Sequence, residues 1–290
     1  MSIIIKDGYK FYDGLSSDYI VVEDGKLNKY IKYINEKGIK SVSIVEVLAY
    51  NRDEIDFLKD CPSIENVNLI SSKVKNYSGL YSLKELQELD IDCLTANLEL
   101  SRLPNLKYFS SEWNKKLLDL ESCKLLERLG LSKFNPSIKN FKSLSKLKNL
   151  KEIILIKSNI TSFKGIGELT NLEKADFSYL RNLEEIDELK LIAGNLKHLR
   201  FDGCKKIKNH EYVTCLKELE LLSFDNCGDI PSIKFINELP KLKKFIFIGS
   251  NIVDGDLSPC NRLEYVGFWD KKHYSHKMKD FKNKMPLTPF

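Results

Sequence analysis

The chain has 290 residues, a formal net charge of +5 and a hydrophobic fraction of 42%. This apolar content is enough for a continuous core, and no apolar run approaches the roughly 20 residues of a membrane span. These values exclude a membrane-spanning chain, and the length alone allows one or two globular domains.

The N-terminal segment, residues 1–36, does not share the pattern of the rest. "SIIIK" and "DYIVVED" predict short strands, with "YKFYDG" between them. "KLNKYIKYINEKG" places Leu27, Tyr30, Ile31 and Ile34 on one helical face and ends at Gly38. We interpret the segment as an N-terminal cap; a separate functional domain is the alternative. It lacks a basic start, a signal-length apolar stretch and a cleavage site, which favours a cytoplasmic protein, with secretion by another route left open.

An apolar phrase then recurs ten times: a branched apolar residue, two variable ones, an apolar, one variable and another apolar. The phrases begin at Ile64, Leu86, Leu106, Leu126, Leu150, Leu172, Leu196, Leu219, Leu242 and Leu263, and Ile39 begins a degenerate eleventh that opens the sheet. A spacing of 20 to 24 residues indicates a solenoid. Because side chains alternate along a strand, the fourth and sixth positions point inward and the third, fifth and seventh point outward.

Two further positions support stacked coils. The ninth position holds Asn114, Ser158, Cys204, Cys227 and Ser250, whose side chains are expected to cap backbone groups inside the coil. Three residues before most phrases lies another apolar residue, in a context that predicts a short α or 3-10 turn.

These phrases resemble the leucine-rich repeat family, in the class of about 22 residues that includes bacterial internalins and eukaryotic phosphatase-regulator-like proteins. The resemblance covers about residues 37–270 and extends to bacterial cytosolic members. It implies an α/β solenoid: a horseshoe of about eleven coils with a parallel concave β-sheet and short α or 3-10 turns on the convex side. The coil at 106–114 departs from the pattern, because Ser111 occupies an inward apolar position and leaves the register open.

The seven cysteines form no Cys-x-x-Cys pair, and several occupy inward positions. We interpret them as reduced structural thiols, because a buried free cysteine behaves as a small apolar residue.

Motifs of catalysis are absent from the sequence. It has no GxxxxGK[ST] loop and no His-Glu-x-x-His, and Gly165-x-Gly167 falls in a turn. His273 and His276 could share a helical face but have no third ligand. His198 has Asp176 and Asp202 as expected neighbours, and an enzyme using His198 is the remote alternative. We expect a protein without catalysis, cofactor or metal.

The outward, concave positions form the candidate partner-binding surface. Positions three, five, seven and eight carry ten acids and six bases, a net charge of −4, which argues against nucleic acid on this face. Acids on neighbouring strands and interleaved aromatic residues are typical of a binding surface. The candidate residues are Asp90, Asp92, Tyr108, Glu112, Trp113, Ile154, Ile156, Asp176, Tyr179, His198, Arg200, Asp202, Asp225, Ile246, Ile248, Tyr265 and Trp269.

Residues 271–290 end the chain with six Lys and one Asp, a charge of +5. This tail is predicted to be a basic C-terminal cap or a solvated end; binding of nucleic acid or an anionic surface through it is the second hypothesis. Phe281 or Phe290 could cover an apolar patch of Ile246, Ile248, Tyr265 and Trp269.

Our first hypothesis is a non-catalytic, monomeric bacterial protein without membrane contact. Its concave face would bind a protein with a basic, partly apolar surface. One version is an immunity protein that inhibits a basic toxin, and another is a signalling adaptor.

Overall fold

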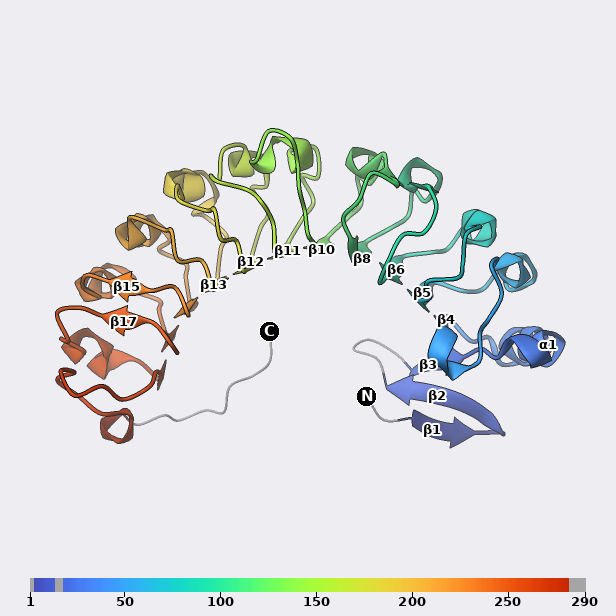
Figure 1. Ribbon diagram of the computed structural model, residues 1–290, viewed down its shortest axis with the longest axis horizontal. Helices are drawn as coiled ribbons and strands as arrows, with labels where there is room; N and C mark the ends of the chain where they lie inside the picture. Colours follow the sequence, from blue (N-terminus) through green and yellow to red (C-terminus); the bar gives the residue numbers. More distant parts are fainter. Residues whose placement is uncertain (1–2, 14–17, 282–290) are drawn as a thin grey trace. The chain divides into compact units, whose positions relative to one another are not determined.

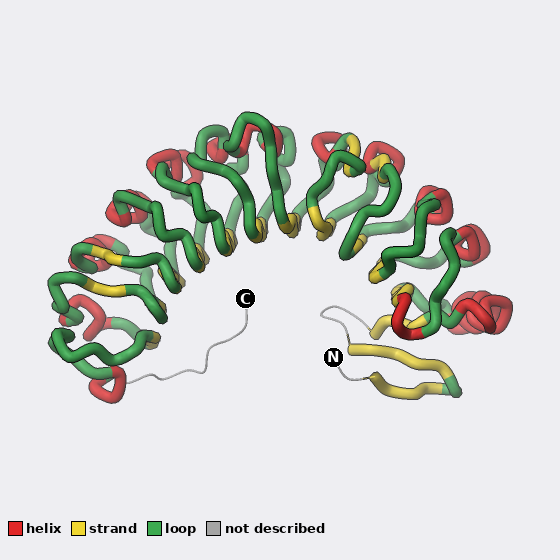
Figure 2. The backbone as a smooth tube through the Cα atoms, viewed as in Figure 1, coloured by secondary structure: helices red, strands yellow, loops and turns green. Residues whose placement is uncertain are grey.

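Each apolar phrase forms one short strand, and in most coils a short 3-10 helix lies on the return path to the next strand (Figure 1). The computed structural model describes residues 3–13 and 18–281. The chain falls into two compact units, Met1–Leu131 and Ser132–Phe290, and the boundary lies inside one strand. Within each unit, the strands of the main sheet lie on one side of the coils and most of the 3-10 helices lie on the other (Figure 2).

Unit 1 contains one α-helix and a mixed sheet in the order β1-β2-β3-β4-β5-β6-β8-β10. A separate two-stranded ladder pairs β7 with β9. The strands are β1 (Ile3–Lys6), β2 (Tyr9–Asp13), β3 (Asp18–Val21), β4 (Ser41–Val45), β5 (Asn66–Ile70), β6 (Glu88–Ile91), β7 (Leu98–Glu99), β8 (Tyr108–Glu112), β9 (Leu117–Leu118) and β10 (Arg128–Ser132). The 3-10 helices are η1 (Asp24–Lys26), η2 (Glu46–Leu48), η3 (Asp56–Asp60), η4 (Ser78–Ser82), η5 (Leu100–Arg102) and η6 (Leu120–Ser122).

The N-terminal segment of unit 1 differs in part from the prediction. The helix is confirmed as α1 (Leu27–Lys37), which buries Leu27, Tyr30 and Ile34 and leaves Ile31 half-buried. It ends at Gly38, whose left-handed φ of 61° lets the next N–H, that of Ile39, donate to the Ile34 carbonyl at 2.9 Å. Residues 9–13, expected only as a link, form strand β2 and pair antiparallel with both β1 and β3. The Ile39 phrase therefore does not open the sheet, because β3 pairs with β4 on its other side.

Unit 2 contains a parallel sheet in the order β11-β12-β13-β14-β16-β18 and a two-stranded ladder of β15 and β17. The strands are β11 (Glu152–Ile156), β12 (Lys174–Ser178), β13 (His198–Asp202), β14 (Leu221–Asp225), β15 (Asp229–Ile230), β16 (Lys244–Ile246), β17 (Asn251–Ile252) and β18 (Tyr265–Gly267). The 3-10 helices are η7 (Phe141–Leu144), η8 (Ile166–Glu168), η9 (Asp187–Ile192), η10 (His210–Cys215), η11 (Lys234–Glu238), η12 (Ser258–Arg262) and η13 (Met278–Asp280).

The core of each unit lies inside the coils, where the fourth and sixth phrase positions stack on one another. In β11, Ile153 and Leu155 are fully buried, whereas Ile154 between them is partly exposed. Phe201 illustrates the stacking, with its ring centroid 5.7 Å from that of Phe177 and 5.3 Å from that of Phe224. The inward positions thus form continuous apolar columns, as the alternation predicts.

The coil at 106–114 keeps the register of its neighbour. Ile91 of β6 pairs with Ser111 of β8, and Ser111 is only 5% exposed. Ser111 therefore occupies the inward position, and its hydroxyl donates to the Glu112 carbonyl at 3.3 Å.

The ninth positions cap the preceding coil, as predicted. The Ser158 hydroxyl donates to the Phe134 carbonyl at 2.7 Å, and the Asn114 amide donates to Leu94 at 3.3 Å. The thiols do the same, since Cys204 donates to the Phe177 carbonyl at 3.2 Å and Cys227 to the Phe201 carbonyl at 3.6 Å. Each of these side chains therefore donates a hydrogen bond to a backbone carbonyl of the preceding coil, where buried carbonyls need donors.

Thiol accessibility provides one test of this ladder. Burial raises the pKa of Cys204 to about 12 and that of Cys123 to about 11, and a thiol reacts as its thiolate. A thiol reagent at neutral pH should modify the exposed Cys93 rapidly and the half-exposed Cys215 slowly. The buried thiols of Cys61, Cys123, Cys204, Cys227 and Cys260 should react only on unfolding. A Cys204–Cys227 disulfide in freshly purified protein would contradict the ladder.

The described part of the C-terminal segment packs against the last coils. Tyr274 is buried, and its hydroxyl accepts a hydrogen bond from the Ile252 N–H at 3.0 Å. Phe281 packs edge-on against Phe268, with ring centroids 5.8 Å apart. Phe290 lies outside the described residues. No helix spans His273 and His276, so the shared helical face considered for them does not form.

Candidate partner-binding surface

The predicted surface residues lie in both units, at the strands and the turns that follow them. Outward-pointing strand residues alternate with buried ones in β8, β10, β11 and β13, as the period of two requires. Unit 1 contributes Asp90, Asp92, Tyr108, Glu112 and Trp113. Unit 2 contributes Ile154, Ile156, Asp176, Tyr179, His198, Arg200, Asp202, Asp225, Ile246, Ile248, Tyr265 and Trp269. We call the side of each sheet that faces away from the coil interior its outward face.

The outward face of unit 1 brings three predicted acids near one another. Asp90 pairs in register with Ser110 of the neighbouring strand β8, and the Glu112 N–H donates to the Asp92 carbonyl at 3.3 Å. Burial raises the pKa of Asp90, and the nearby Asp92 carboxylate raises it further, while a hydrogen bond from Ser110 opposes the shift. Asp92 itself is exposed.

The acidic character of the outward positions belongs entirely to unit 1. Of the ten acids and six bases, unit 1 holds five acids and one base, a net charge of −4, whereas unit 2 holds five of each. The unit 1 residues are Glu46, Glu88, Asp90, Asp92, Glu112 and Arg128. Arg128 is engaged within the unit, since its guanidinium lies 2.7 Å from Glu88 and 4.7 Å from the centroid of the Tyr108 ring.

Two tyrosines from the N-terminal strands also belong to this face and were not predicted. Tyr12 of β2 and Tyr19 of β3 stack with ring centroids 5.1 Å apart, and the Asn68 amide donates to the Tyr12 hydroxyl at 2.7 Å. Asn68 and Ser43, although polar and outward, are only 6% and 0% exposed. Burial is the main cause that raises the pKa of Tyr19, and the carboxylates of Glu88 and Asp90 raise it further. The rings of Tyr12 and Tyr19 therefore lie beside the acidic residues of the outward face.

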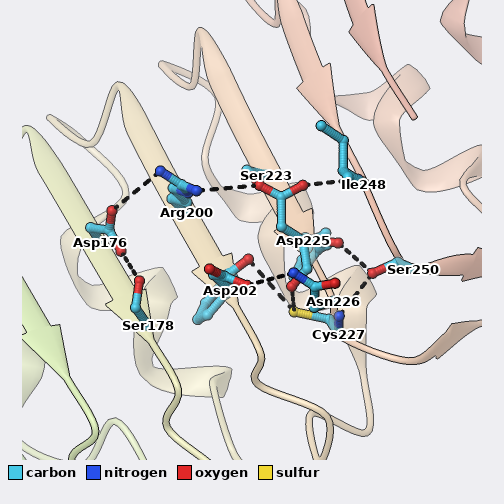
Figure 3. A network of polar contacts seen from close by, with 12 residues as sticks. Asp176, Ser178, Arg200, Asp202, Ser223, Asp225, Asn226, Cys227, Ile248 and Ser250 are labelled. Carbon is cyan, nitrogen blue, oxygen red and sulfur yellow. Dashed lines mark hydrogen bonds and ion pairs between the residues drawn. The ribbon is translucent and has the colours of Figure 1, made fainter. Parts of the chain in front are cut away.

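In unit 2, Arg200 links two buried acids across neighbouring strands (Figure 3). Its guanidinium lies 3.9 Å from the Asp176 carboxylate and 3.6 Å from the Asp225 carboxylate. These two acids point outward yet are only 8% and 7% exposed. They are therefore held within the sheet surface and offer little area to a partner.

Asp202 and Asp225 pair directly in register, so the predicted crowding of like charges is present. Asp225 accepts hydrogen bonds from the Ser223 hydroxyl at 2.8 Å and the Ile248 N–H at 2.9 Å. Asp202 accepts from the Asn226 amide at 3.0 Å. Both acids therefore have hydrogen-bond partners within the fold.

Asp225→Asn provides a test of this crowding. Burial raises the pKa of Asp225 above its ordinary 3.8, with a smaller contribution from Asp202, so the folded state binds protons more readily than the unfolded chain. Stability is then lost as pH rises through the folded pKa. Asp225→Asn should match or exceed the wild-type melting temperature at pH 7, and the gain should vanish below about pH 3.8. Lower stability of the variant at pH 7 would mean that the charge itself is needed.

Comparisons with known proteins support the fold seen in these coils. No family model matches the sequence. The chain is 28% identical over 207 residues to a Buchnera aphidicola protein named "Putative phosphatase", covering 66% of this chain and 69% of that protein. An internalin (inlF) from Listeria monocytogenes matches with a TM-score of 0.53 and 18% identity, covering 80% of this chain and 74% of that one. A TLR13–ssRNA13 complex matches with a TM-score of 0.52 and 15% identity, covering 85% and 45%.

The chain has the leucine-rich repeat fold. Each repeat contributes one strand to the main sheet, with 3-10 helices where the sequence allowed either α or 3-10 turns. Within the described ranges, no group of three or more His, Cys, Asp and Glu side chains could hold a metal ion. No helix of those ranges has the length and apolar character needed to cross a membrane.

The neighbours of His198 on the repeats differ from those expected. His198 pairs in register with Lys174 and Leu221, and Asp176 pairs with Arg200 instead. Burial lowers the pKa of His198, as do Lys174 and Lys244, and Glu220 opposes the shift. Asp176 and Asp202, the carboxylates considered as partners of a catalytic His198, are therefore not its in-register neighbours.

The apolar patch on the last repeats is smaller than predicted. Ile246 is only 7% exposed, because it packs close to Gly267 and Tyr265. Trp269 is 64% exposed, which makes it the most exposed large side chain of the four. Phe281 packs on Phe268 and His276 at the end of the coil stack, while Phe290 is outside the described residues.

Proposed function

We propose that this leucine-rich repeat protein is a non-catalytic scaffold that binds a protein with a basic, partly apolar surface through the outward face of unit 1. The observation that carries the proposal is the charge of −4 on that face, set against zero on the outward positions of unit 2. Clustered acids cost stability in the free protein and are offset when a cationic partner arrives.

The burial of Asp90 supports this proposal. Its raised pKa reports that the folded protein holds the carboxylate in an unfavourable setting, with Asp92 nearby. A cation of the partner would relieve that repulsion and lower the Asp90 pKa on binding. In the described part of the chain no ion pair holds this partly buried acid, and a crowded acid of this kind is costly for the fold, so a binding role explains it better than a stabilising one.

Aromatic side chains beside the acids supply the apolar part of the surface. Tyr108 and Trp113 are partly exposed, and Tyr108 is held by Arg128. Tyr and Trp are enriched among residues that dominate binding energy, because they bury a large area with few rotatable bonds. Trp113 is accordingly proposed as the apolar anchor, with Asp92 and Glu112 steering association.

Two biological versions fit this chemistry: an immunity protein that neutralises a basic toxin such as a nuclease, and an adaptor in a signalling assembly. Both require a cationic partner and no turnover. The name of the Buchnera aphidicola relative raises phosphatase activity as an alternative, and His198 is the residue considered from the sequence for an enzyme of unspecified reaction. The lysine-rich environment of His198, with Glu220 as its acid, disfavours a general base there. Nucleic-acid binding through the basic tail is the remaining alternative.

The test compares capture by the intact protein with capture by face variants in a lysate of the source organism. Asp90→Asn/Asp92→Asn/Glu112→Gln removes three charges from the outward face. A matched control, Asp60→Asn/Glu85→Gln/Glu121→Gln, removes three exposed charges from the segments between the strands. The control should keep the captured partner and the triple face variant should lose it.

Binding kinetics on the purified partner then separate steering from anchoring. The triple face variant should slow association about tenfold at low salt and flatten the salt dependence. Trp113→Ala should leave association nearly unchanged and raise the dissociation rate about tenfold or more. Binding that survives both variants, or turnover of a phosphate ester that His198→Gln abolishes, would overturn the proposal.

A further inference from the structure

A second candidate site lies in unit 2, at the edge where strands β12, β13 and β14 end. The residue after each strand has a left-handed backbone: Tyr179 with φ of 58°, Gly203 with 65° and Asn226 with 50°. In this conformation the N–H of each residue donates to a carbonyl of the next coil, as Tyr179 does to Asp202 at 2.6 Å and Gly203 to Asp225 at 2.9 Å. The edge is therefore built by hydrogen bonds and holds its shape without a ligand.

The side chains of Tyr179 and Asn226 lie close to the glycine at the equivalent position of the next coil, Gly203 and Gly249 respectively. A Cβ placed on Gly203 would lie only 2.9 Å from Cδ1 of the Tyr179 ring, so the glycine makes room for the aromatic side chain. The ring is nevertheless 42% exposed. Most of the equivalent positions in unit 2 carry Lys, Gly or Asn, and the tyrosine is the aromatic one among them. Its ring forms a fixed, partly open wall.

This wall borders a cavity of about 560 Å³ lined by Tyr179, Arg181, Gly203, Lys205, Lys206 and Asn226. Three of the six lining residues are cations and none is an acid. Within the described ranges, Arg181 and Lys205 have no ion-pair partner, and Lys206 donates to the Asn182 amide oxygen at 3.3 Å. Two acids of these coils have partners of their own: Asp202 accepts a hydrogen bond from the Asn226 amide at 3.0 Å, and Glu184 pairs with Lys208 at 2.6 Å, although Lys206 also lies near Glu184.

We propose that this cavity binds a nucleoside phosphate. Arg and Lys side chains recognise phosphate through charge-assisted hydrogen bonds, and an Arg fork can bind two of its oxygens. An aromatic ring beside the phosphate position offers a stacking surface for a planar base. The cavity volume suits a ligand of this size. This site is separate from the acidic face of the proposed function and does not depend on it.

The experiment is isothermal titration calorimetry of the full chain with four probes: ADP, adenosine, inorganic phosphate and a short single-stranded oligonucleotide. ADP should bind measurably more tightly than either adenosine or inorganic phosphate, because only ADP uses both the cations and the ring. Tyr179→Asn removes the ring and keeps a residue that Asn226 shows to be compatible with the left-handed backbone. It should weaken ADP about tenfold and leave inorganic phosphate unchanged.

The cations are tested by Lys205→Gln/Lys206→Gln, which should weaken ADP at least tenfold and reduce the dependence of binding on salt. The matched control, Lys234→Gln/Lys272→Gln, removes two exposed charges outside the cavity and should bind ADP like the wild type. Far-ultraviolet circular dichroism melts of all variants separate loss of binding from loss of fold.

Three outcomes would overturn the proposal: no ADP binding, equal affinity for ADP and inorganic phosphate, or equal weakening by the control pair. Oligonucleotide binding that is tighter than ADP and lost in the same two variants would support the site, with the nucleoside phosphate supplied by a nucleic-acid strand. ADP binding lost in the cavity variants supports the free nucleotide.

Discussion

Leu155→Ala is expected to lower the free energy of unfolding by about 2–5 kcal/mol. Leu155 is fully buried at the sixth position of its phrase, and it pairs in register with Phe177 of the next coil. Truncation removes several buried methyl and methylene groups and leaves a cavity that the stacked coils cannot close, because hydrogen-bonded strands hold them at a fixed spacing. The measurement is urea unfolding followed by circular dichroism.

Ile154→Ala is the matched control, one residue away in the same strand. Ile154 points outward beside Asp176 and is partly exposed, so its truncation removes less buried area and creates no enclosed cavity. The loss should be well below that for Leu155→Ala. Similar losses at both positions would contradict the inward and outward assignment on which the whole repeat description depends.

The sequence predicts the coil interior well because each rule there is local and repeated. Alternation within a strand assigns Leu155 inward and Ile154 outward, and the same alternation places Ser111 inward although it is polar. The ninth-position residues behave alike whether the donor is an amide, a hydroxyl or a thiol, since Asn114, Ser158 and Cys204 all reach a carbonyl of the previous coil. In a repeating fold the same positional rule applies to each repeat, so the repeats support one another's assignment.

The outward face is less predictable, because its contacts join different coils. Arg200 could not be assigned to Asp176 and Asp225 from spacing alone, since an outward side chain can reach either neighbouring strand. The stacking of Tyr12 and Tyr19 depends on an antiparallel pairing that the repeat pattern does not contain. The β-type alternation of residues 9–13 is itself a strand signal, but it lies outside the repeated phrases.

The orientation of the Tyr179 ring could not be predicted from the sequence either. Its placement in the eighth position was apparent, but the left-handed backbone that turns its ring toward Gly203 was not. The repeated appearance of Lys, Gly and Asn at this position is a signal for φ above zero, because Gly and Asn adopt it most readily. That signal also explains why Asn is the natural replacement in the Tyr179 test.

His210 introduces a pH-dependent weakness into unit 2. The side chain is 4% exposed at the start of η10, and its ring lies edge-on to Phe224 with centroids 4.9 Å apart. Neither ring nitrogen has a hydrogen-bond partner in the part of the chain that the structure describes. Burial alone lowers the pKa of His210 from 6.5 to about 4. The imidazole is therefore neutral in the folded protein at neutral pH, with two polar atoms that the core does not satisfy.

The consequence is a loss of stability on acidification that His210→Leu should remove. Between about pH 6.5 and pH 4 the unfolded chain binds a proton at His210 and the folded protein does not, so stability falls as pH falls. The difference in pKa corresponds to about 3 kcal/mol. His210→Leu should be as stable as the wild type or more so at pH 7.5, because it buries no unsatisfied nitrogen. Urea unfolding at half-unit steps from pH 7.5 to pH 4 should then show the wild type losing about 3 kcal/mol more than the variant. If the free energies of unfolding of the two proteins change equally with pH, protonated His210 must gain a hydrogen-bond partner or contact solvent in the folded state. The packing against Phe224 would then rearrange without a loss of stability.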